Sequence, residues 1–227
     1  MRDNGVLLVD KCAGMTSHDV VNLLRRKLKI KKIGHAGTLD PGATGLLIML
    51  IGKATKLSTE FLNLDKVYSV VLRLGVKTKT ADMQGEIIET NDVPQFSPDY
   101  IQEKFSSFKG EQVQIPPMVS AKKINGKKLY VLARKGIEVE RKPQKIEISS
   151  LEILKIKLPE IFFVMRCSKG TYVRTLCEDI GESFGCGACM HRLRRISIGK
   201  YCVEQALSID KILQLSEEQI EEHLFNL

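Results

Sequence analysis

The fold is decided by the stretch Gly34-His35-Ala36-Gly37-Thr38-Leu39-Asp40-Pro41-Gly42-Ala43-Thr44-Gly45. Its four glycines and one proline favour backbone conformations that most residues resist. A single carboxylate, Asp40, stands beside the rigid Pro41. We interpret the stretch as a loop that presents this acid, and an Asp-Pro turn without chemistry is the alternative. It is not a P-loop, because the pattern G-x-x-x-x-G-K-[ST] is absent.

Short apolar elements flank this loop on both sides. The run from Val6 to Asp10 predicts a strand, and Leu46 to Leu50 is typical of a buried strand. Between the first strand and the loop, Thr16 or Ser17 is expected to cap a helix. The apolar positions of that helix recur at helical spacing: Val20, Val21, Leu24 and Leu28. A polar loop delivered by buried strands is a usual place for chemistry.

Further along, strands and helices are interspersed without the regular alternation of a doubly wound fold. The pattern predicts strands at Val67–Leu74 and Glu86–Glu89 and two more within Lys145–Arg166, helices at Ser97–Ser107 and Tyr172–Phe184, and a loop or hairpin at Val113–Tyr130. This mixture favours an α/β mixed (α+β) sheet protein.

Composition indicates a folded protein in a reducing compartment. No apolar run approaches the roughly 20 residues that span a bilayer, and the first ten residues carry charges, so we expect no membrane segment and a cytoplasmic location. The six cysteines are expected to be reduced thiols. Cys186 and Cys189 form a C-x-x-C pair near His191, but no second pair stands at ligand spacing, so we expect no metal.

The charge distribution favours a polyanionic partner. The formal net charge is +8 and the pI about 9.1. Two runs concentrate the basic residues, Arg25–Lys32 and Lys122–Lys145, whereas Glu217, Glu218, Glu221 and Glu222 make the C-terminal tail acidic. Each basic run could also be an ordinary solvated surface.

The Gly34–Gly45 stretch resembles the catalytic motif of the TruB family of tRNA pseudouridine synthases, and further motifs follow in the family's order. They are Lys66-Val67-Tyr68 with Leu74-Gly75, Thr78-x-Thr80-x-Asp82-x-x-Gly85, Pro116–Lys123 continuing to Gly126, Tyr130, Ala133 and Arg134, Ser168–Leu176, and Leu193-Arg194-Arg195. The resemblance runs from about Asp10 to Tyr201. It implies a pseudouridine synthase fold, in which helices and RNA-binding loops flank a central, largely antiparallel sheet.

The sequence departs from the family pattern in three respects. Cys12 stands where the family usually has proline, and Cys189 where a histidine often follows Gly-Ala. The chain also ends near Leu227, without room for the C-terminal PUA domain of many relatives. We therefore expect a catalytic domain at 1–205, with an RNA-gripping insertion around 110–145, and a short acidic helical tail at 206–227.

The resemblance implies isomerisation of uridine 55 in the T loop of tRNA, with Asp40 as the catalytic carboxylate. Asp40 could attack C1′ of the ribose, add to C6 of the base or remove the C2′ proton, and the sequence does not choose. An ionised carboxylate in a dry pocket needs a cation, which the resemblance identifies as Arg174. The flipped base would meet Tyr68 and Leu193, with Tyr172 beside the pocket. The expected RNA-binding residues are His35, which fills the vacancy left by the base, and Lys11, Lys122, Lys123, Arg134, Arg194 and Arg195.

We expect no cofactor, a monomer, and the T arm of tRNA as the only obligatory partner. Two alternatives remain open. One is a dyskerin-like enzyme, which works with a guide RNA inside a ribonucleoprotein. The other is a non-catalytic RNA-binding or RNA-chaperone module with the same fold.

Overall fold

The computed structural model describes residues 4–120, 122–124, 126–133 and 135–225, with only the backbone at 123, 124, 127 and 128. The chain divides into two compact units. Unit 1 comprises Met1–Tyr68 and Leu193–Leu227, and unit 2 comprises Ser69–Arg192. The chain passes between the units within two strands, β4 (Lys66–Leu74) and β12 (Ala188–Ile198).

Unit 1 is built on a sheet in which the order of strands is β14-β1-β3-β12. Its strands are β1 (Gly5–Lys11), β2 (Ile33–Ala36), β3 (Thr44–Ile51), β13 (Tyr201–Cys202), β14 (Leu207–Ser208) and the end of β12. Strand β3 pairs antiparallel with β1 and β2 and parallel with β12, so its first residues lie between β1 and β12. The loop that carries Asp40 connects β2 to β3.

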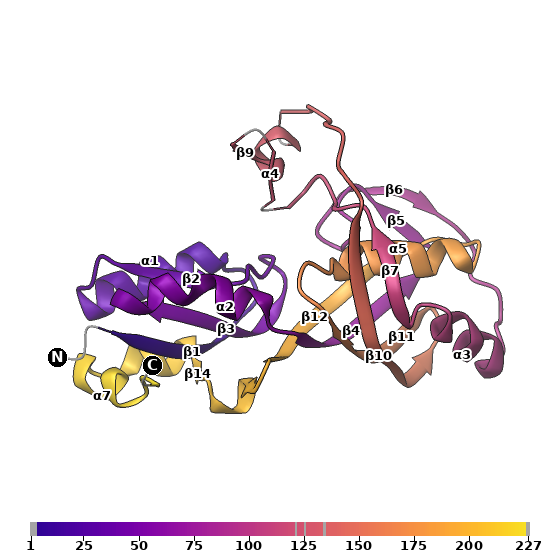
Figure 1. Cartoon of the computed structure of the whole chain (residues 1–227). Coiled ribbons are helices and arrows are strands. Elements are labelled where there is room, and N and C mark those ends of the chain that lie inside the picture. The colour runs from indigo at the N-terminus through magenta and orange to yellow at the C-terminus, as the bar shows by residue number, and fades with distance from the viewer. Residues whose placement is uncertain (1–3, 121, 125, 134, 226–227) are drawn as a thin grey trace. The chain divides into compact units, whose positions relative to one another are not determined.

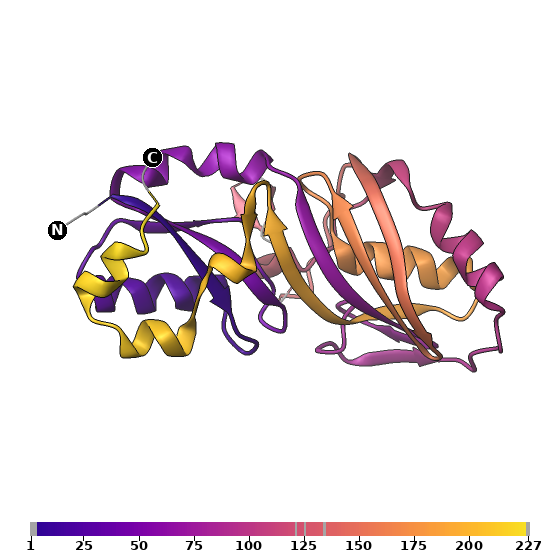
Figure 2. The ribbon, with the colours of Figure 1, turned by 90° about the horizontal axis from the view of Figure 1, so that it is seen from below.

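Helices cover both faces of this sheet (Figure 2). They are α1 (Ser17–Leu28), η1 (Gly52–Leu57), α2 (Ser58–Asn63), η2 (Val203–Gln205), α6 (Ile209–Gln214) and α7 (Glu217–Glu222). Alternate residues of β1 face opposite cores: Leu7 packs with α1, α6 and α7, and Leu8 packs with η1 and α2. A capping box fixes the start of α1, because Thr16 and Asp19 each bond to the other's backbone N–H.

Unit 2 contains an antiparallel sheet in which β4, β11 (Glu160–Cys167), β10 (Gln144–Lys157) and β7 (Gly110–Gln114) are neighbours. Helices α3 (Pro98–Ser106) and α5 (Val173–Ser183) belong to this unit, and Phe105 of α3 meets Phe163 edge-on, with ring centroids 5.3 Å apart. A second ribbon pairs β5 (Val76–Thr78) with β6 (Ile87–Thr90). The segment with β8 (Lys123–Ile124), β9 (Lys127–Lys128) and α4 (Leu129–Ala133) stands away from the main sheet of this unit (Figure 1).

The expected fold class, a mixed α/β protein with a largely antiparallel sheet, is confirmed. The flanking helices and the hairpin also appear where the sequence predicts them. One boundary is wrong: residues 33–36 form strand β2, so the irregular loop covers only 37–43. Among the described residues, no helix is long and apolar enough to span a membrane.

Candidate functional site

Two buried cations hold the loop that carries Asp40, and both come from strands next to β3. Lys11 of β1 and Arg195 of β12 both lie opposite Gly45 of β3. Residues in one row across a sheet project from the same face. Gly45 has no side chain, so the two long cations flank it on the neighbouring strands, and both bond to backbone oxygens within residues 37–41.

Lys11 is fully buried, and its ammonium group donates to three backbone carbonyls. The acceptors are the oxygens of Cys12 at 2.9 Å, Met15 at 2.8 Å and Pro41 at 3.2 Å. Burial lowers the pKa of Lys11 to about 8, and the negative charge of Asp40 is among those that oppose the shift. Lys11 therefore ties the turn after β1 to the residue that follows Asp40.

Arg195 supports the other side of the same loop. Its side chain is 1% exposed, and it donates from Nε to the oxygen of Leu46 at 2.7 Å and from its terminal nitrogens to Gly37 at 3.0 Å and Thr38 at 3.4 Å. These bonds satisfy carbonyls on both sides of the loop, which would otherwise lack partners in the interior. The guanidinium thus fixes where the loop leaves β2 and where it enters β3.

A third tether comes from helix α1. The backbone N–H of Leu39 donates to Oγ of Ser17 at 2.9 Å, and the hydroxyl of Ser17 donates to the oxygen of Leu39 at 3.2 Å. Ser17 is buried, whereas Asp40 is partly exposed. The loop is therefore held by bonds to its backbone immediately before and after Asp40.

We expect Gly45→Ala to destabilise the protein by about 3 kcal/mol or more. Gly45 has a φ of +102°, and a Cβ there would overlap the backbone of Arg195. The measurement is the free energy of unfolding in urea. Gly14→Ala is the matched control, because Gly14 has a φ of +86° with no atom within 4 Å of an added Cβ, so it carries only the backbone strain, about 1 kcal/mol. Equal losses in the two variants would contradict the predicted overlap.

In unit 2, Arg174 is the second residue of helix α5 and is 4% exposed. Its terminal nitrogens donate to the backbone oxygens of Thr80 at 3.0 Å and Val119 at 2.7 Å, and its Nε lies 3.9 Å from Oδ2 of Asp82. The guanidinium therefore joins the Thr78–Gly85 loop to the insertion around residues 110–145. Both segments belong to the sequence motifs, but no local pattern in them predicts that they lie side by side.

Asp82 lies beside Arg174, and its motif in the sequence predicted no role for it. Its Oδ1 accepts from Oγ1 of Thr80 at 2.7 Å and from the N–H of Gln84 at 3.1 Å, and its side chain is 12% exposed. The hydroxyl of Thr78 also donates to its backbone oxygen at 2.7 Å. The Thr-x-Thr-x-Asp spacing could have predicted this turn, since threonine hydroxyls close to a carboxylate in sequence often form hydrogen bonds within a turn.

The other side chains predicted to meet the flipped base are partly or fully buried. Tyr68 on β4 and Leu193 on β12 are each 8% exposed and stand where the chain passes between the units. Tyr172 precedes α5, and its backbone N–H and C=O both bond to the side chain of Gln114, at 2.9 and 3.0 Å. His35 lies on β2 opposite Met49. The predicted pairing of Asp40 with Arg174 stays a prediction.

The cations predicted to contact RNA differ in their exposure and in their hydrogen-bond partners. Arg194 pairs through both terminal nitrogens with Asp10, at 3.0 and 2.7 Å, and keeps 40% of its side chain exposed. Lys122 is exposed and donates to Oε1 of Gln144 at 3.1 Å. Arg134 and the side chain of Lys123 lie outside the described residues. Lys11 and Arg195 are buried, and their charged groups donate hydrogen bonds to backbone carbonyls.

The cysteines and histidine considered for zinc have other neighbours. Cys186 and Cys189 are buried, and burial raises the pKa of both thiols, that of Cys189 to about 11. Sγ of Cys189 lies 3.4 Å from Sδ of Met83, and Nδ1 of His191 lies 2.7 Å from Oε1 of Glu160. Within the described ranges, no group of three or more potential ligands could hold a metal ion.

Comparison with protein families identifies the chain. The TruB family pseudouridylate synthase (N terminal domain) matches residues 25–173, and the tRNA pseudouridylate synthase B C-terminal domain matches residues 174–227. The chain belongs to the TruB family of pseudouridylate synthases. This confirms the expected family and the expected class of enzyme, an isomerase. The domain limits predicted at residue 205 remain a prediction.

Similar proteins agree with this assignment. The tRNA pseudouridine synthase B of Opitutus terrae is 50% identical over 221 residues, which are 97% of this chain and 92% of that protein. The protein of the same name from Alkaliphilus oremlandii is 48% identical over 97% of this chain and 73% of its own length.

Solved structures share the fold at lower identity. A Cbf5-Nop10-Gar1 complex contains a chain with a TM-score of 0.73 and 27% identity. A chain of an H/ACA RNP bound to a substrate RNA containing 2′-deoxyuridine has a TM-score of 0.71 and 26% identity. These matches cover 97% and 98% of this chain, and 62% and 56% of the solved chains.

Proposed function

We propose that this protein isomerises uridine 55 in the T loop of tRNA to pseudouridine, with Asp40 as the catalytic carboxylate. The observation that carries the proposal is the bracing of the 37–43 loop by Lys11, Arg195 and Ser17. A catalytic carboxylate must be held in one place relative to the ribose, and small displacements cost large factors in rate. Lys11 and Arg195 meet this requirement, because both are buried and both bond to the backbone of the loop that carries Asp40.

The choice of tRNA as substrate rests on the relatives. Proteins named tRNA pseudouridine synthase B are 48–50% identical to this chain over 97% of its length, whereas the Cbf5 chain is 27% identical. The larger identity favours a stand-alone enzyme over a guide-RNA-dependent one. We propose that the protein acts as a monomer in the cytoplasm, without a cofactor or an obligatory protein partner.

The reaction breaks the bond between C1′ and N1 of the uridine and forms a bond between C1′ and C5. The target base is stacked inside the folded T loop, so it must first be flipped out. His35 is proposed to occupy the vacancy. The flipped ring would lie against Tyr68 and the apolar side chain of Leu193, with Tyr172 at the edge of the pocket. Asp40 then acts at C1′, at C6 or on the C2′ proton.

Arg174 is proposed as the counter-charge of Asp40. Its guanidinium is oriented by the Thr80 and Val119 carbonyls, and it is nearly buried, so its charge is little screened by water. A fixed cation of this kind keeps a carboxylate ionised in a dry pocket. Val119 lies in the insertion around 110–145. RNA bound by that insertion would therefore influence the position of the Arg174 guanidinium through its bond to Val119.

The structure changes the role that we propose for two of the predicted RNA contacts. Lys11 and Arg195 are positioning residues, since their charged groups face backbone oxygens within unit 1. Lys122 and Arg194 retain exposed side chains and remain proposed contacts to RNA phosphates, as do Lys123 and Arg134 from the sequence.

The test is a T-arm transcript with the native loop, incubated with the purified protein and then mapped for pseudouridine at each uridine. We expect modification at position 55 alone. A transcript with cytidine at that position is the control, and it should remain unmodified at the other uridines of the loop. Absence of pseudouridine, or its appearance at another position, would refute the proposed function.

A further inference from the structure

The C-terminal end of helix α1 borders an open hollow that is lined almost entirely by cations. We call it the α1 hollow. It has a volume of about 470 Å³, and its lining residues are Arg25, Arg26, Lys29, Ile30 and Lys31. All of them belong to unit 1, and they come from the last turn of the helix and the segment that follows it.

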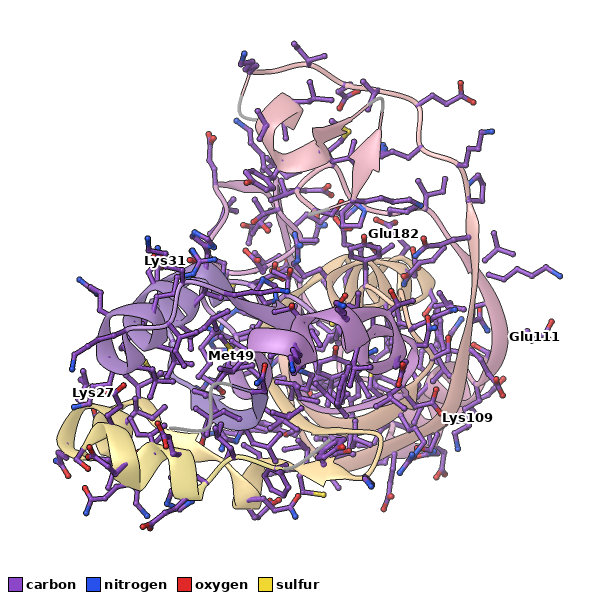
Figure 3. The ribbon with its side chains drawn as sticks, turned by 60° about the vertical axis from the view of Figure 1, so that its left-hand side comes forward. Lys27, Lys31, Met49, Lys109, Glu111 and Glu182 are labelled. Carbon is purple, nitrogen blue, oxygen red and sulfur yellow. The ribbon has the colours of Figure 1, made fainter. Side chains whose placement is uncertain are left out.

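Internal partners explain only some of the cations in the Arg25–Lys32 run. Lys27 donates to the backbone oxygen of Leu213 at 2.8 Å, and Lys29 pairs with Glu217 at 3.2 Å, so both reach toward the C-terminal helices α6 and α7. Figure 3 shows Lys27 next to those helices and Lys31 apart from them. Among the residues that the structure describes, no carboxylate pairs with Arg25, Arg26 or Lys31.

The guanidinium of Arg25 is held in place by one hydrogen bond, but not all of its N–H groups have a partner among the described residues. One terminal nitrogen donates to the oxygen of Ile33 at 3.0 Å, at the start of β2, and this bond orients the guanidinium. Its Nε is buried and has no hydrogen-bond partner within the described part of the chain. A buried N–H without an acceptor is costly. Arg25 also lines the α1 hollow, where an anion would offset its charge.

The helix dipole alone does not account for this arrangement. Cations in the last turn of a helix are favoured by about 0.3–1 kcal/mol each, which is sufficient reason for Arg25, Arg26 and Lys27. Lys31 lies beyond the helix, which ends at Leu28, and yet it lines the same hollow. The cationic lining therefore extends past the end of the helix, which the dipole alone does not explain.

A second hollow leads from this surface toward the Asp40 loop. Its volume is about 440 Å³, and it shares Arg25 and Arg26 with the α1 hollow. It continues along α1 to Met15, whose backbone oxygen accepts from Lys11, and Lys11 also bonds to Pro41 beside Asp40. The carboxylate of Asp19 lines it too, but Thr16 holds that group. The positive charge is therefore concentrated at the α1 hollow.

We infer that the α1 hollow binds a backbone phosphate of the substrate RNA, at a site separate from the pocket of the flipped uridine. A phosphodiester has oxygens to accept from Arg25, Arg26 and Lys31, and its charge offsets theirs. An RNA strand that leaves the Asp40 loop along α1 reaches this hollow within unit 1. The inference rests on the proposed function only in taking RNA as the ligand.

The test compares two double variants of the full chain. Arg26→Gln with Lys31→Gln removes two exposed cations of the hollow, and Lys53→Gln with Lys56→Gln removes two exposed cations elsewhere in unit 1. Binding of a tRNA transcript is measured across a salt series. For the hollow variant we expect the slope of log Kobs against log salt to fall in magnitude by about 1 to 2, and the affinity at about 0.1 M salt to fall on the order of tenfold.

The control variant should bind nearly as the wild type does, and both should turn over bound tRNA at the wild-type rate, because neither pair belongs to the Asp40 loop. Equal loss of affinity in the two variants would show that RNA binding depends on the total surface charge of unit 1, and it would contradict a specific phosphate site at the α1 hollow. An unchanged salt slope in the hollow variant would overturn it as well. Binding is measured separately from isomerisation, so a protein that fails to modify tRNA would refute the proposed function and leave this test valid.

Discussion

Replacing Asp40 with asparagine is expected to abolish isomerisation while RNA binding survives. Asparagine has the same shape, but it cannot act as a nucleophile or accept a proton as a carboxylate does. The loop should keep its position, because the backbone of residues 37–41 remains bonded to the side chains of Ser17, Lys11 and Arg195. We expect the single-turnover rate on a T-arm transcript to fall by about 10⁴-fold or more.

Asp65→Asn is the matched control for this variant. Asp65 is an exposed aspartate of the same unit, just before β4. Its backbone oxygen accepts from the N–H of Gly199 at 2.9 Å, and its carboxylate pairs with no other group that the structure describes. It should retain the wild-type rate. Affinity for tRNA should stay within about threefold of wild type in both variants, since phosphate contacts supply most of it. Residual turnover near the wild-type rate in Asp40→Asn would refute the assigned role.

Much of the fold could be predicted from local patterns. The capped helix at Ser17–Leu28 and the buried strand at Thr44–Ile51 have strong periodicity and clear boundaries, and both formed as expected. Strand β12 at Ala188–Ile198 received no prediction, because His191, Arg192, Arg194 and Arg195 interrupt its apolar pattern. Its identity as a strand depends on its pairing with a distant strand, and local sequence does not carry that information.

The roles of the basic residues were harder to predict than their presence. Lysine and arginine are rarely buried unless they are paired, so Lys11 and Arg195 appeared to be surface contacts for phosphate. Their partners are backbone carbonyls from residues up to 158 positions away, which no motif reveals. In the Arg25–Lys32 run the reverse holds, because Arg26 and Lys31 are exposed and lack an internal counter-ion among the described residues. The sequence therefore shows where basic residues occur, and tertiary packing decides whether their charges are free to contact RNA.

The second large effect is expected for Arg174. The variant Arg174→Ala removes a nearly buried guanidinium that orders the Thr80 and Val119 carbonyls and lies 3.9 Å from Asp82. If Arg174 also provides the charge opposite Asp40, its loss weakens both the ionisation of that acid and its orientation. We expect the single-turnover rate to fall by about 10² to 10³-fold, the range for removal of one preorganised electrostatic group.

Arg174→Lys separates charge from geometry. Lysine retains a positive charge, but it lacks the planar fork that reaches two carbonyls at once, so we expect it to recover only part of the rate. Arg166→Ala, at an exposed arginine on β11 of the same unit, is the control and should behave as wild type. A merely structural role for Arg174 would lower the free energy of unfolding without a matching loss of rate in the protein that remains folded. Wild-type rates in Arg174→Ala at saturating RNA would therefore remove Arg174 from the reaction, and full rescue by lysine would reduce its part to charge alone.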